Sequence, residues 1–293
     1  MMWQTSRFAI DVSLPKIMGI VNLTPDSFSD GGQRTSDVEQ IRFAEKLLKE
    51  GADILDLGAE STRPGSTPVP AGEELARLAP VLREVVKWNV PISIDTYKPT
   101  VMQTALDMGA DIINDVWALR QKIDGLCAEA VVAQHTTCGV CLMHMSGEPT
   151  TMQQNPMQPD RAGGVVVAVK DFLSERSQSL ARRGVAKNRI VWDVGIGFGK
   201  TPEQNFELLA KQAAFLPSGY PLLCAWSRKS SLGKIILQSK DDAAANRIHA
   251  SVAASVLAVE RGARLVRVHD VRATKDALLV WTAARKQFDE RFL

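Results

Sequence analysis

From about residue 16 to its end, the chain alternates between short apolar or β-branched runs and longer amphipathic stretches. This alternation is typical of parallel strands joined by helical crossovers. The expected strands lie at 16–24, 52–58, 91–96, 111–116, 139–145, 190–195, 221–227 and 265–270. Eight such units favour a closed (β/α)8 TIM barrel of the α/β class, with an open doubly wound sheet as the alternative.

Amphipathic patterns separate these runs and predict the helices. They lie at 36–50, 72–88, 98–108, 122–136, 160–183, 202–215, 241–261 and 272–290. Gly51, Gly109, Gly184 and Gly262 stand where C-terminal helix caps are expected. We therefore expect one barrel domain over 16–293, preceded by an extension at 1–15 that forms a strand or hairpin closing the barrel floor.

Composition excludes several classes of protein. The hydrophobic residues make up 45% and the charged residues 23% of the chain, which is usual for a globular domain. A net charge of +2 provides no general attraction for nucleic acid or membranes. No apolar run reaches the ~18 residues of a membrane span, and the N-terminus lacks a signal-peptide pattern. Four cysteines indicate no disulfide framework. We expect a cytoplasmic protein with small-molecule partners.

One cluster could be interpreted as a zinc site. His135, Cys138, Cys141 and His144 recur at every third residue. Residues three apart share a helix face, but the segment 139–145 is expected to be a strand, where they point to opposite sides. The pattern therefore favours buried thiols and a packed histidine over a metal site.

Polar side chains gather at the ends of seven of the eight expected strands. Catalytic groups in this barrel lie at the carboxyl ends of the strands and in the loops that follow. These ends carry the segments 22–32, 58–67, Asp95, Asn114 with Asp115, Asp193 with GIGFG, SRKSS and RVHD. Rim residues also serve solubility and helix capping, but their convergence favours a polar ligand site.

The rim residues divide into two chemical sets. Asp95, Asn114, Asp193 and Lys229 suit a flat heterocycle with amino, ring-nitrogen and carbonyl groups. An anion would instead be held by Thr62, Arg63, Arg267 and His269, since Arg offers a forked donor and His can be protonated. A heterocycle joined to a diphosphate would satisfy both sets. GIGFGK alone is a weak nucleotide signal, because it lacks the order GxxxxGK[ST].

Several motifs occur in an order that resembles one known family. They are MGIVNLTPDSFSDGG, DLGAESTRPGS, SIDTYKP, INDV, CLMHMSGEPTTMQ, DVGIGFGKT, SRKSSLG and RVHDV. With these motifs the sequence resembles the bacterial dihydropteroate synthases along nearly its whole length. The resemblance implies a transferase of folate biosynthesis, a cytoplasmic homodimer and a sulfonamide target. Its substrates would be (7,8-dihydropterin-6-yl)methyl diphosphate and 4-aminobenzoate, with Mg²⁺ as cofactor.

The resemblance also implies the roles of individual residues. The pterin would be bound by Asp95, Asn114, Asp193, Lys229, Met143 and Arg267. Mg²⁺ would contact Asn22, and the diphosphate would contact Thr62, Arg267 and His269. The 4-aminobenzoate site would comprise Phe28, Thr62, Arg63, Pro64, Gly197, Phe198, Lys229 and Ser230. Catalysis would rest on Asp95, Arg63, Lys229, Arg267 and His269. The chain departs from the family pattern at Val194 and Ser231, which leaves the local loop shape and the fit of inhibitors open.

Other functions make different demands on these residues. A methyltetrahydrofolate-dependent corrinoid methyltransferase shares a pterin-binding barrel but does not need NLTPDSFSDGG and ESTRPGS for a diphosphate. A non-catalytic pterin-binding paralogue would be expected to lose residues of the anion set, all of which are present. A barrel of unrelated phosphate chemistry would leave the pterin set unexplained.

Overall fold

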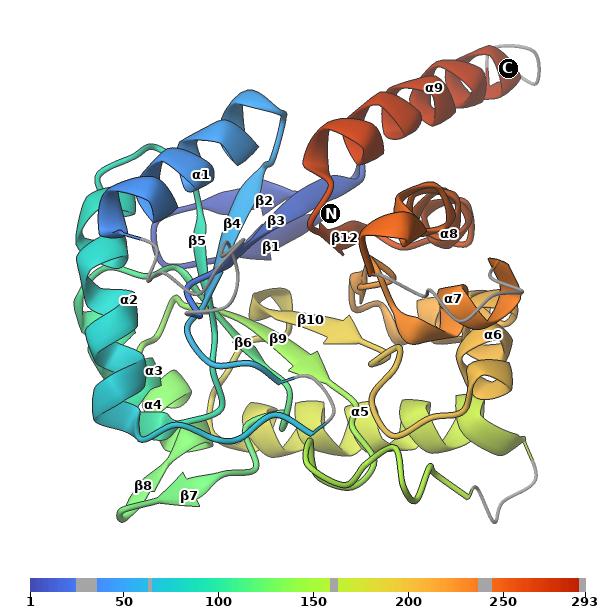
Figure 1. The fold of residues 1–293 in the computed structure, drawn as a ribbon. Helices are drawn as coiled ribbons and strands as arrows, with labels where there is room; N and C mark the ends of the chain where they lie inside the picture. The colour runs from blue at the N-terminus through green and yellow to red at the C-terminus, as the bar shows by residue number, and fades with distance from the viewer. Residues whose placement is uncertain (25–35, 63–64, 159–162, 237–243, 290–293) are drawn as a thin grey trace.

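The chain forms a closed barrel of parallel strands, which confirms the fold predicted from the sequence (Figure 1). The computed structural model describes residues 1–24, 36–62, 65–158, 163–236 and 244–289. Around the barrel the described strands are, in spatial order, β3 (Lys16–Asn22), β4 (Ile54–Gly58), β5 (Ile92–Asp95), β6 (Ile112–Asp115), β9 (Gly139–Met143), β10 (Ile190–Asp193), β11 (Leu222–Cys224) and β12 (Leu265–Val268). β12 pairs with β3 in parallel register, and this pairing closes the sheet.

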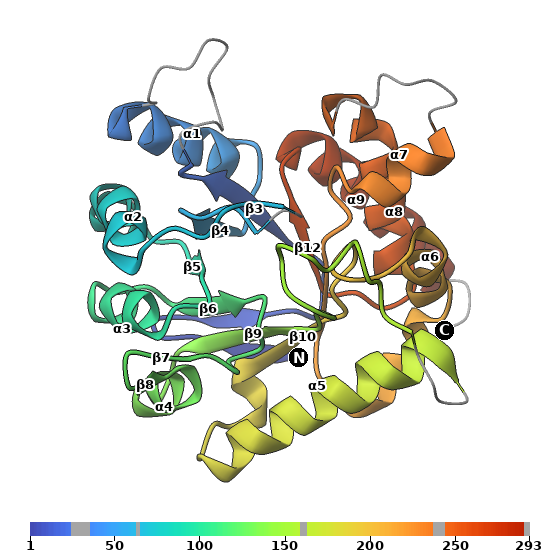
Figure 2. The ribbon, with the colours of Figure 1, turned by 60° about the horizontal axis from the view of Figure 1, so that its bottom comes forward.

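Helices surround the barrel and cover its outer face (Figure 2). They are α1 (Asp37–Lys49), α2 (Ala71–Val85), α3 (Pro99–Asp107), α4 (Ala128–Gln134), α5 (Gly164–Arg182), α6 (Pro202–Ala210), α7 (Ser230–Ile236), α8 (Ile248–Glu260) and α9 (Val271–Asp289), with short 3₁₀ turns η1 (Lys187–Arg189), η2 (Gln212–Ser218) and η3 (Ala244–Arg247). Gly51, Gly109, Gly184 and Gly262 all have positive φ at the ends of α1, α3, α5 and α8, so the predicted caps are confirmed.

Two helical predictions were wrong in detail, and one short helix was missed. The segment 122–136 begins with a hairpin of β7 (Lys122–Ile123) and β8 (Leu126–Cys127) before α4 starts. Its turn is Asp124-Gly125, with φ of 51° and 80°, and this dipeptide favours such tight turns. The prediction at 202–215 crosses from α6 into η2, and α7 was not predicted. Seven-residue α7 is too short to show a clear helical period.

The strands alternate between an outer core and the barrel interior. Leu55 and Leu57 pack in the main cluster under the helices, whereas Ile54 belongs to the cluster inside the barrel. Met18, Ile112, Cys141, Val191, Leu223 and Leu265 complete that interior apolar layer. Side chains two residues apart on a strand share a face. The residues two positions further along these strands therefore form the next interior layer, nearer the carboxyl ends.

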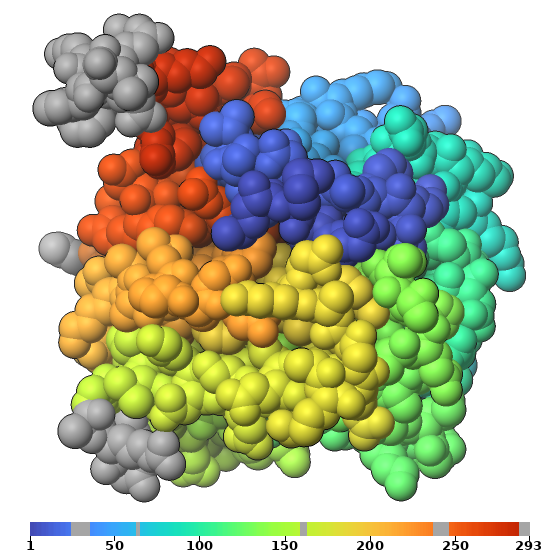
Figure 3. Space-filling view, turned by 180° about the vertical axis from the view of Figure 1, so that it is seen from behind, coloured from blue at the N-terminus to red at the C-terminus, as the bar shows by residue number. Residues whose placement is uncertain are grey.

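The N-terminal residues form an antiparallel hairpin, β1 (Met2–Gln4) with β2 (Ala9–Asp11). Trp3 is fully buried against the interior apolar layer, and its indole donates to the carbonyl oxygen of Arg189 at 2.9 Å. Arg7 pairs with buried Asp111 at 2.6 Å. The hairpin therefore packs against the amino ends of the strands, and Figure 3 shows it in dark blue across this face.

In the described part of the chain, no helix has the length and apolar character needed to cross a lipid bilayer.

Candidate active site

A cavity of about 970 Å³ opens at the carboxyl ends of the strands. It brings together nine of the residues predicted from the sequence: Asn22, Thr62, Asp95, Gly197, Phe198, Lys229, Ser230, Arg267 and His269. The predicted residues Phe28, Arg63 and Pro64 lie outside the described residues. The rim location expected for a barrel site is therefore found for these nine residues.

Directly above the interior apolar layer, the side chains become polar. Two residues beyond Ile54, Ile112, Val191 and Leu265 stand Asp56, Asn114, Asp193 and Arg267. These polar positions face the barrel interior because they share the strand face of the apolar residues below them. Strand register thus determines which polar residues lie at the floor of the cavity. Asn114 and Asp193 are buried at this level and do not line the cavity itself.

Arg267 connects two buried carboxylates at the floor. Its Nε donates to Oδ2 of Asp56 at 2.6 Å, and its Nη2 donates to Oδ2 of Asp95 at 2.6 Å. Asn114 donates to the same Asp56 oxygen at 3.3 Å. Burial opposes the charge of the guanidinium, but the two carboxylates overcome it and raise the pKa of Arg267. Arg267 therefore stays charged and its plane is fixed from two sides.

Asp95 has an unusual protonation equilibrium. Burial raises its pKa to about 7, Arg267 acts in the opposite direction, and the charge of Asp56 adds to the increase. One oxygen of each carboxylate, Oδ1 of Asp56 and Oδ1 of Asp95, is buried and accepts no hydrogen bond within the described structure. Buried acceptors are usually paired, and Asp95 lines the cavity whereas Asp56 does not, so a ligand with N–H groups is a suitable partner for Oδ1 of Asp95.

The loop after β10 is held by two charged side chains. The N–H of Gly195 donates to Oδ1 of Asp193 at 2.8 Å. Burial raises the pKa of Asp193, while this hydrogen bond and Lys229 lower it. Lys200 is buried and donates to the carbonyl oxygens of His144, Gly195 and Phe198 at 3.2, 2.8 and 3.2 Å. Burial lowers the pKa of Lys200 to about 7.

One wall of the cavity is aromatic and cationic. The Lys229 ammonium lies 4.2 Å from the centre of the Phe198 ring. Phe198 in turn packs beside a small buried cluster that contains Met143, at the end of β9. A flat ligand in the cavity would therefore meet Phe198 as an apolar surface and Lys229 as a donor, whereas Met143 is buried and does not line the cavity.

Further cationic side chains concentrate around the cavity where β11 and β12 end. His269 lies with Nδ1 3.0 Å from the Ser227 hydroxyl, which also accepts the His269 backbone N–H at 3.1 Å. Arg228 makes two hydrogen bonds to Asp270, at 3.0 and 2.6 Å, and lines the cavity with Arg247. With Arg267 and Lys229, these groups make this part of the cavity suitable for an anion.

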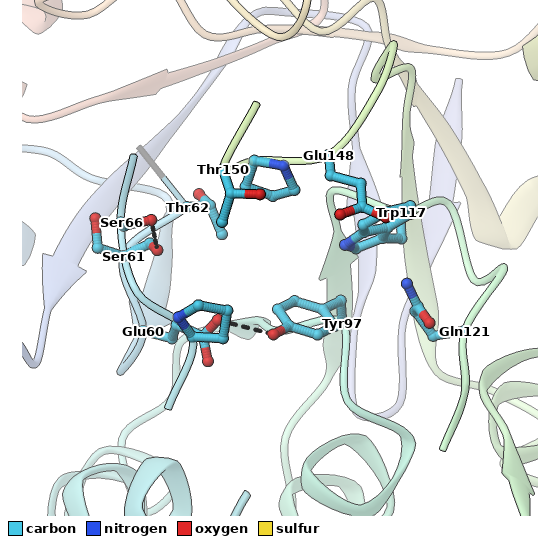
Figure 4. Close-up of a pocket in the computed structure, with 11 residues that line it drawn as sticks. Glu60, Ser61, Thr62, Ser66, Tyr97, Trp117, Gln121, Glu148 and Thr150 are labelled. Carbon is cyan, nitrogen blue, oxygen red and sulfur yellow. Dashed lines mark hydrogen bonds between the residues drawn. The ribbon is translucent and has the colours of Figure 1, made fainter. Parts of the chain in front are cut away.

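A second, smaller pocket of about 220 Å³ shares Glu60, Ser61 and Thr62 with the main cavity. Figure 4 shows Tyr97, Trp117 and Gln121 on the far side of this pocket. Glu60 accepts from the Tyr97 hydroxyl at 2.9 Å and is ion-paired with buried Lys98. Lys98 also reaches Glu74 at 2.6 Å. This buried network fixes the start of the loop that carries Thr62.

The spacing that could indicate zinc does not produce a cluster of ligands. Cys138 lies 3.1 Å from Arg189, Cys141 faces the barrel interior, and His144 packs edge-on against Phe172 at 4.9 Å. Within the described ranges, no group of three or more His, Cys, Asp or Glu side chains is placed to hold a metal ion.

Sequence reasoning missed three residues that hold the site together: Asp56, Ser227 and Lys200. Asp56 had a usable signal, because it is a lone charge at an interior position of an otherwise apolar strand. Ser227 had none, since its partner His269 lies 42 residues away along the chain, and neither did the contact of Lys200 with His144, 56 residues away.

Comparisons with known proteins agree with this geometry. The family described as pterin binding enzyme matches residues 18–269, a range that includes both Asn22 and His269. A dihydropteroate synthase of Neisseria meningitidis serogroup B is 49% identical over 286 residues, covering 96% of this chain and 96% of its own.

Two of the similar solved structures match this chain over nearly its whole length. The Burkholderia cenocepacia dihydropteroate synthase complexed with 7,8-dihydropteroate has a TM-score of 0.86 at 45% identity, covering 99% of this chain and 98% of its own. The Xanthomonas albilineans enzyme with 4-aminobenzoic acid has a TM-score of 0.85 at 44% identity, covering 94% of this chain and 95% of its own.

Proposed function

This chain belongs to the pterin-binding enzymes and, among them, to the dihydropteroate synthases, and we propose that its rim cavity is where the reaction takes place. The enzyme is a transferase of folate synthesis that joins (7,8-dihydropterin-6-yl)methyl diphosphate to 4-aminobenzoate and releases diphosphate. The observation that best supports the location is the buried Oδ1 of Asp95, which accepts no hydrogen bond within the described residues and lies at the cavity beside Arg267.

The pterin would lie on the floor of the cavity. Its amino and ring N–H groups would donate to Oδ1 of Asp95, which lines the cavity, whereas Asp56 is fully buried and would act by holding Arg267. Asn114, Asp193 and Lys229 would complete the polar edge, and Met143 and Arg267 would face the ring. A planar heterocycle with several donors matches this set better than a simple sugar or a carboxylic acid, because the acceptors are buried and fixed.

The diphosphate would lie toward Thr62, Arg267 and His269. Asn22 fits as one ligand of Mg²⁺, since its amide lines the same cavity as Arg267 and His269, and Mg²⁺ often combines few protein oxygens with substrate phosphate oxygens. When bound, the ion would add positive charge where the leaving diphosphate gathers negative charge. Arg267 would do the same from the protein side, already charged and held in place by its two carboxylates.

The reaction is displacement of diphosphate from the pterin methylene by an aromatic amine. An aniline-type nitrogen is a modest nucleophile, so departure of the diphosphate would dominate and the methylene would become cation-like. We assign stabilisation of that charge to ionised Asp95, since a carboxylate in a buried site interacts more strongly than in water. The ring of 4-aminobenzoate would pack between Phe198 and Lys229 beside Gly197, with its carboxylate at Ser230. Phe28, Arg63 and Pro64 would complete that site.

Two further properties are proposals of the same kind. A cytoplasmic location is supported by four cysteines that are all in the thiol form, as is usual in a reducing compartment.

A homodimer is supported by exposed apolar side chains on α8 and α9, because such patches often mark interfaces. These side chains are Leu257, Leu279 and Val280, the last of them 71% exposed. Sedimentation velocity of the parent and of Val280→Asp tests the dimer, because a charge at a buried interface would produce monomers.

The function is tested by measuring dihydropteroate formation by the purified protein with and without Mg²⁺. We expect metal-dependent product, and a higher Mg²⁺ requirement for Asn22→Ala. Tight binding of the pterin substrate without product would instead indicate a non-catalytic pterin-binding protein. Methyl transfer from methyltetrahydrofolate without dihydropteroate formation would indicate the corrinoid methyltransferase alternative.

A further inference from the structure

The peptide of Gly197 is fixed by side chains on both sides. Its N–H donates to Oδ1 of Asn205 at 2.9 Å, and its carbonyl accepts from Gln153 at 2.7 Å. Gly197 has a φ of +80°, and a Cβ there would meet Cδ of Lys229 at 3.1 Å. The loop after β10 thus lies directly against the Lys229 side chain.

Asn205 reaches a second wall of the same cavity. Its Nδ2 donates to the Ser231 hydroxyl at 2.9 Å, and both side chains are buried. Ser231 directly follows Ser230, at the start of α7. One amide therefore joins the loop after β10 to the start of α7, with its oxygen toward Gly197 and its nitrogen toward Ser231, and both ends of the amide are satisfied.

The helix that carries Asn205 is firmly anchored. At the start of α6, Thr201 and Gln204 form a capping box, in which each side chain bonds to the backbone of the other residue. Gln204 also donates to the carbonyl of Met157 at 2.8 Å, and the Met157 N–H donates to the carbonyl of Gly199 at 2.8 Å. Asn205 is therefore held in place, and its two hydrogen bonds set the distance between the loop after β10 and the start of α7.

We propose that Asn205 and Ser231 are positioning residues for 4-aminobenzoate, which set the separation between the Gly197–Phe198 wall and the Ser230 wall of its site. The inference rests on the proposed function. A benzoate ring is rigid, so its ring contacts and its carboxylate contact can be made together only at one wall separation. Displacement of a binding group by about 1 Å is enough to weaken an oriented interaction strongly.

Ser231→Ala is the principal test, because it removes only a hydroxyl group and leaves the Asn205 Nδ2 donor without its partner. We expect the KM for 4-aminobenzoate to rise about tenfold, while kcat and the KM for the pterin diphosphate stay within about twofold of the parent enzyme. Ser231→Thr keeps the hydroxyl and should restore the KM for 4-aminobenzoate to within about threefold.

Ser177→Ala is the matched control. Ser177 is also buried and accepts from an N–H donor, the Trp192 indole, at 2.8 Å, but it lies on α5 and, unlike Ser231, is not next to a residue that lines the cavity. Both alanine variants should lower the thermal midpoint by similar amounts, and only Ser231→Ala should change the KM for 4-aminobenzoate. An unchanged KM, or equal increases for both substrates, would overturn the proposal while parent activity stands. Absence of product from the parent would overturn the proposed function itself.

Discussion

The Nη2 atom of Arg267 lies 2.6 Å from Oδ2 of Asp95, so the cation of the anion set and the carboxylate of the pterin set form one ion pair. The two sets, which the sequence presented as separate, meet at this contact. The other oxygen of Asp95, Oδ1, is buried and accepts no hydrogen bond within the described residues, so it is the acceptor that this ion pair leaves for a ligand.

Asp95→Asn keeps the shape of the side chain and removes its charge. If Asp95 stabilises a cation-like methylene, turnover should fall by about 100-fold or more while the KM for the pterin diphosphate changes less than about fivefold. Steady-state kinetics with each substrate varied in turn measures both effects. Equal losses in turnover and in pterin affinity would rule out the cation role, because they would indicate a loss of binding alone.

The activity should depend on pH through the same carboxylate. Burial raises the pKa of Asp95 to about 7, so the reactive anion forms only as pH increases through that value. We expect log(kcat/KM) for the pterin diphosphate to rise with pH up to about 7 and then to level off, since this parameter reports the free enzyme. The rising limb should be absent in Asp95→Asn. A parent profile without a rise below pH 7 would contradict the assignment.

The same shift predicts how stability depends on pH. The folded pKa of about 7 lies above the ordinary value of 3.8 for Asp95, and the pKa of buried Asp115 is also raised to about 7. Between these two pH values the folded protein keeps protons that the unfolded chain has released, so this contribution to stability is lost as pH rises through about 7. Urea unfolding at several pH values should show a smaller decline for Asp95→Asn than for the parent.

Asp56→Asn should impair function although no motif assigned Asp56 a role. The substitution removes the charge that orients Arg267 at Nε, so we expect the KM for the pterin diphosphate to rise by about tenfold. Asp53→Asn is the control, because Asp53 lies on the same segment just before β4 but pairs with the Ile17 N–H at 2.8 Å and with Lys16 at 3.7 Å, and not with Arg267. Similar kinetic effects in both variants would show that Asp56 matters only for stability.

Gly195→Ala and Gly184→Ala distinguish the cost of a left-handed backbone conformation from the cost of a steric clash. Both residues have positive φ, 69° and 82°. Such a conformation costs a residue with a Cβ about 1–2 kcal/mol. At Gly184 a Cβ meets nothing within 4 Å, whereas at Gly195 it would overlap the carbonyl oxygen of His144. Chemical denaturation should show a loss near that range for Gly184→Ala and a loss at least about 2 kcal/mol larger for Gly195→Ala. Equal losses would mean that the loop after β10 can move away from His144.

The sequence determined the barrel and the location of its site. Alternating strand and helix patterns fixed the order of elements, because each pattern reflects local burial that the chain itself encodes. Polar residues at strand ends were found for the same reason, and Asp95, Lys229, Arg267 and His269 all line one cavity. The hairpin at Asp124-Gly125 and short α7 escaped prediction because local periodicity is weak over so few residues.

Only the tertiary structure decided which of these groups are joined. Arg267 and Asp56 are 211 residues apart in the chain and 2.6 Å apart in space, and Asn205 reaches Gly197 and Ser231 on opposite sides. Barrel closure brings the last strand against the first, and register then stacks polar residues over apolar ones. The raised pKa of Asp95 arises in the same way, because burial and a neighbouring charge belong to the packed barrel and to no single segment.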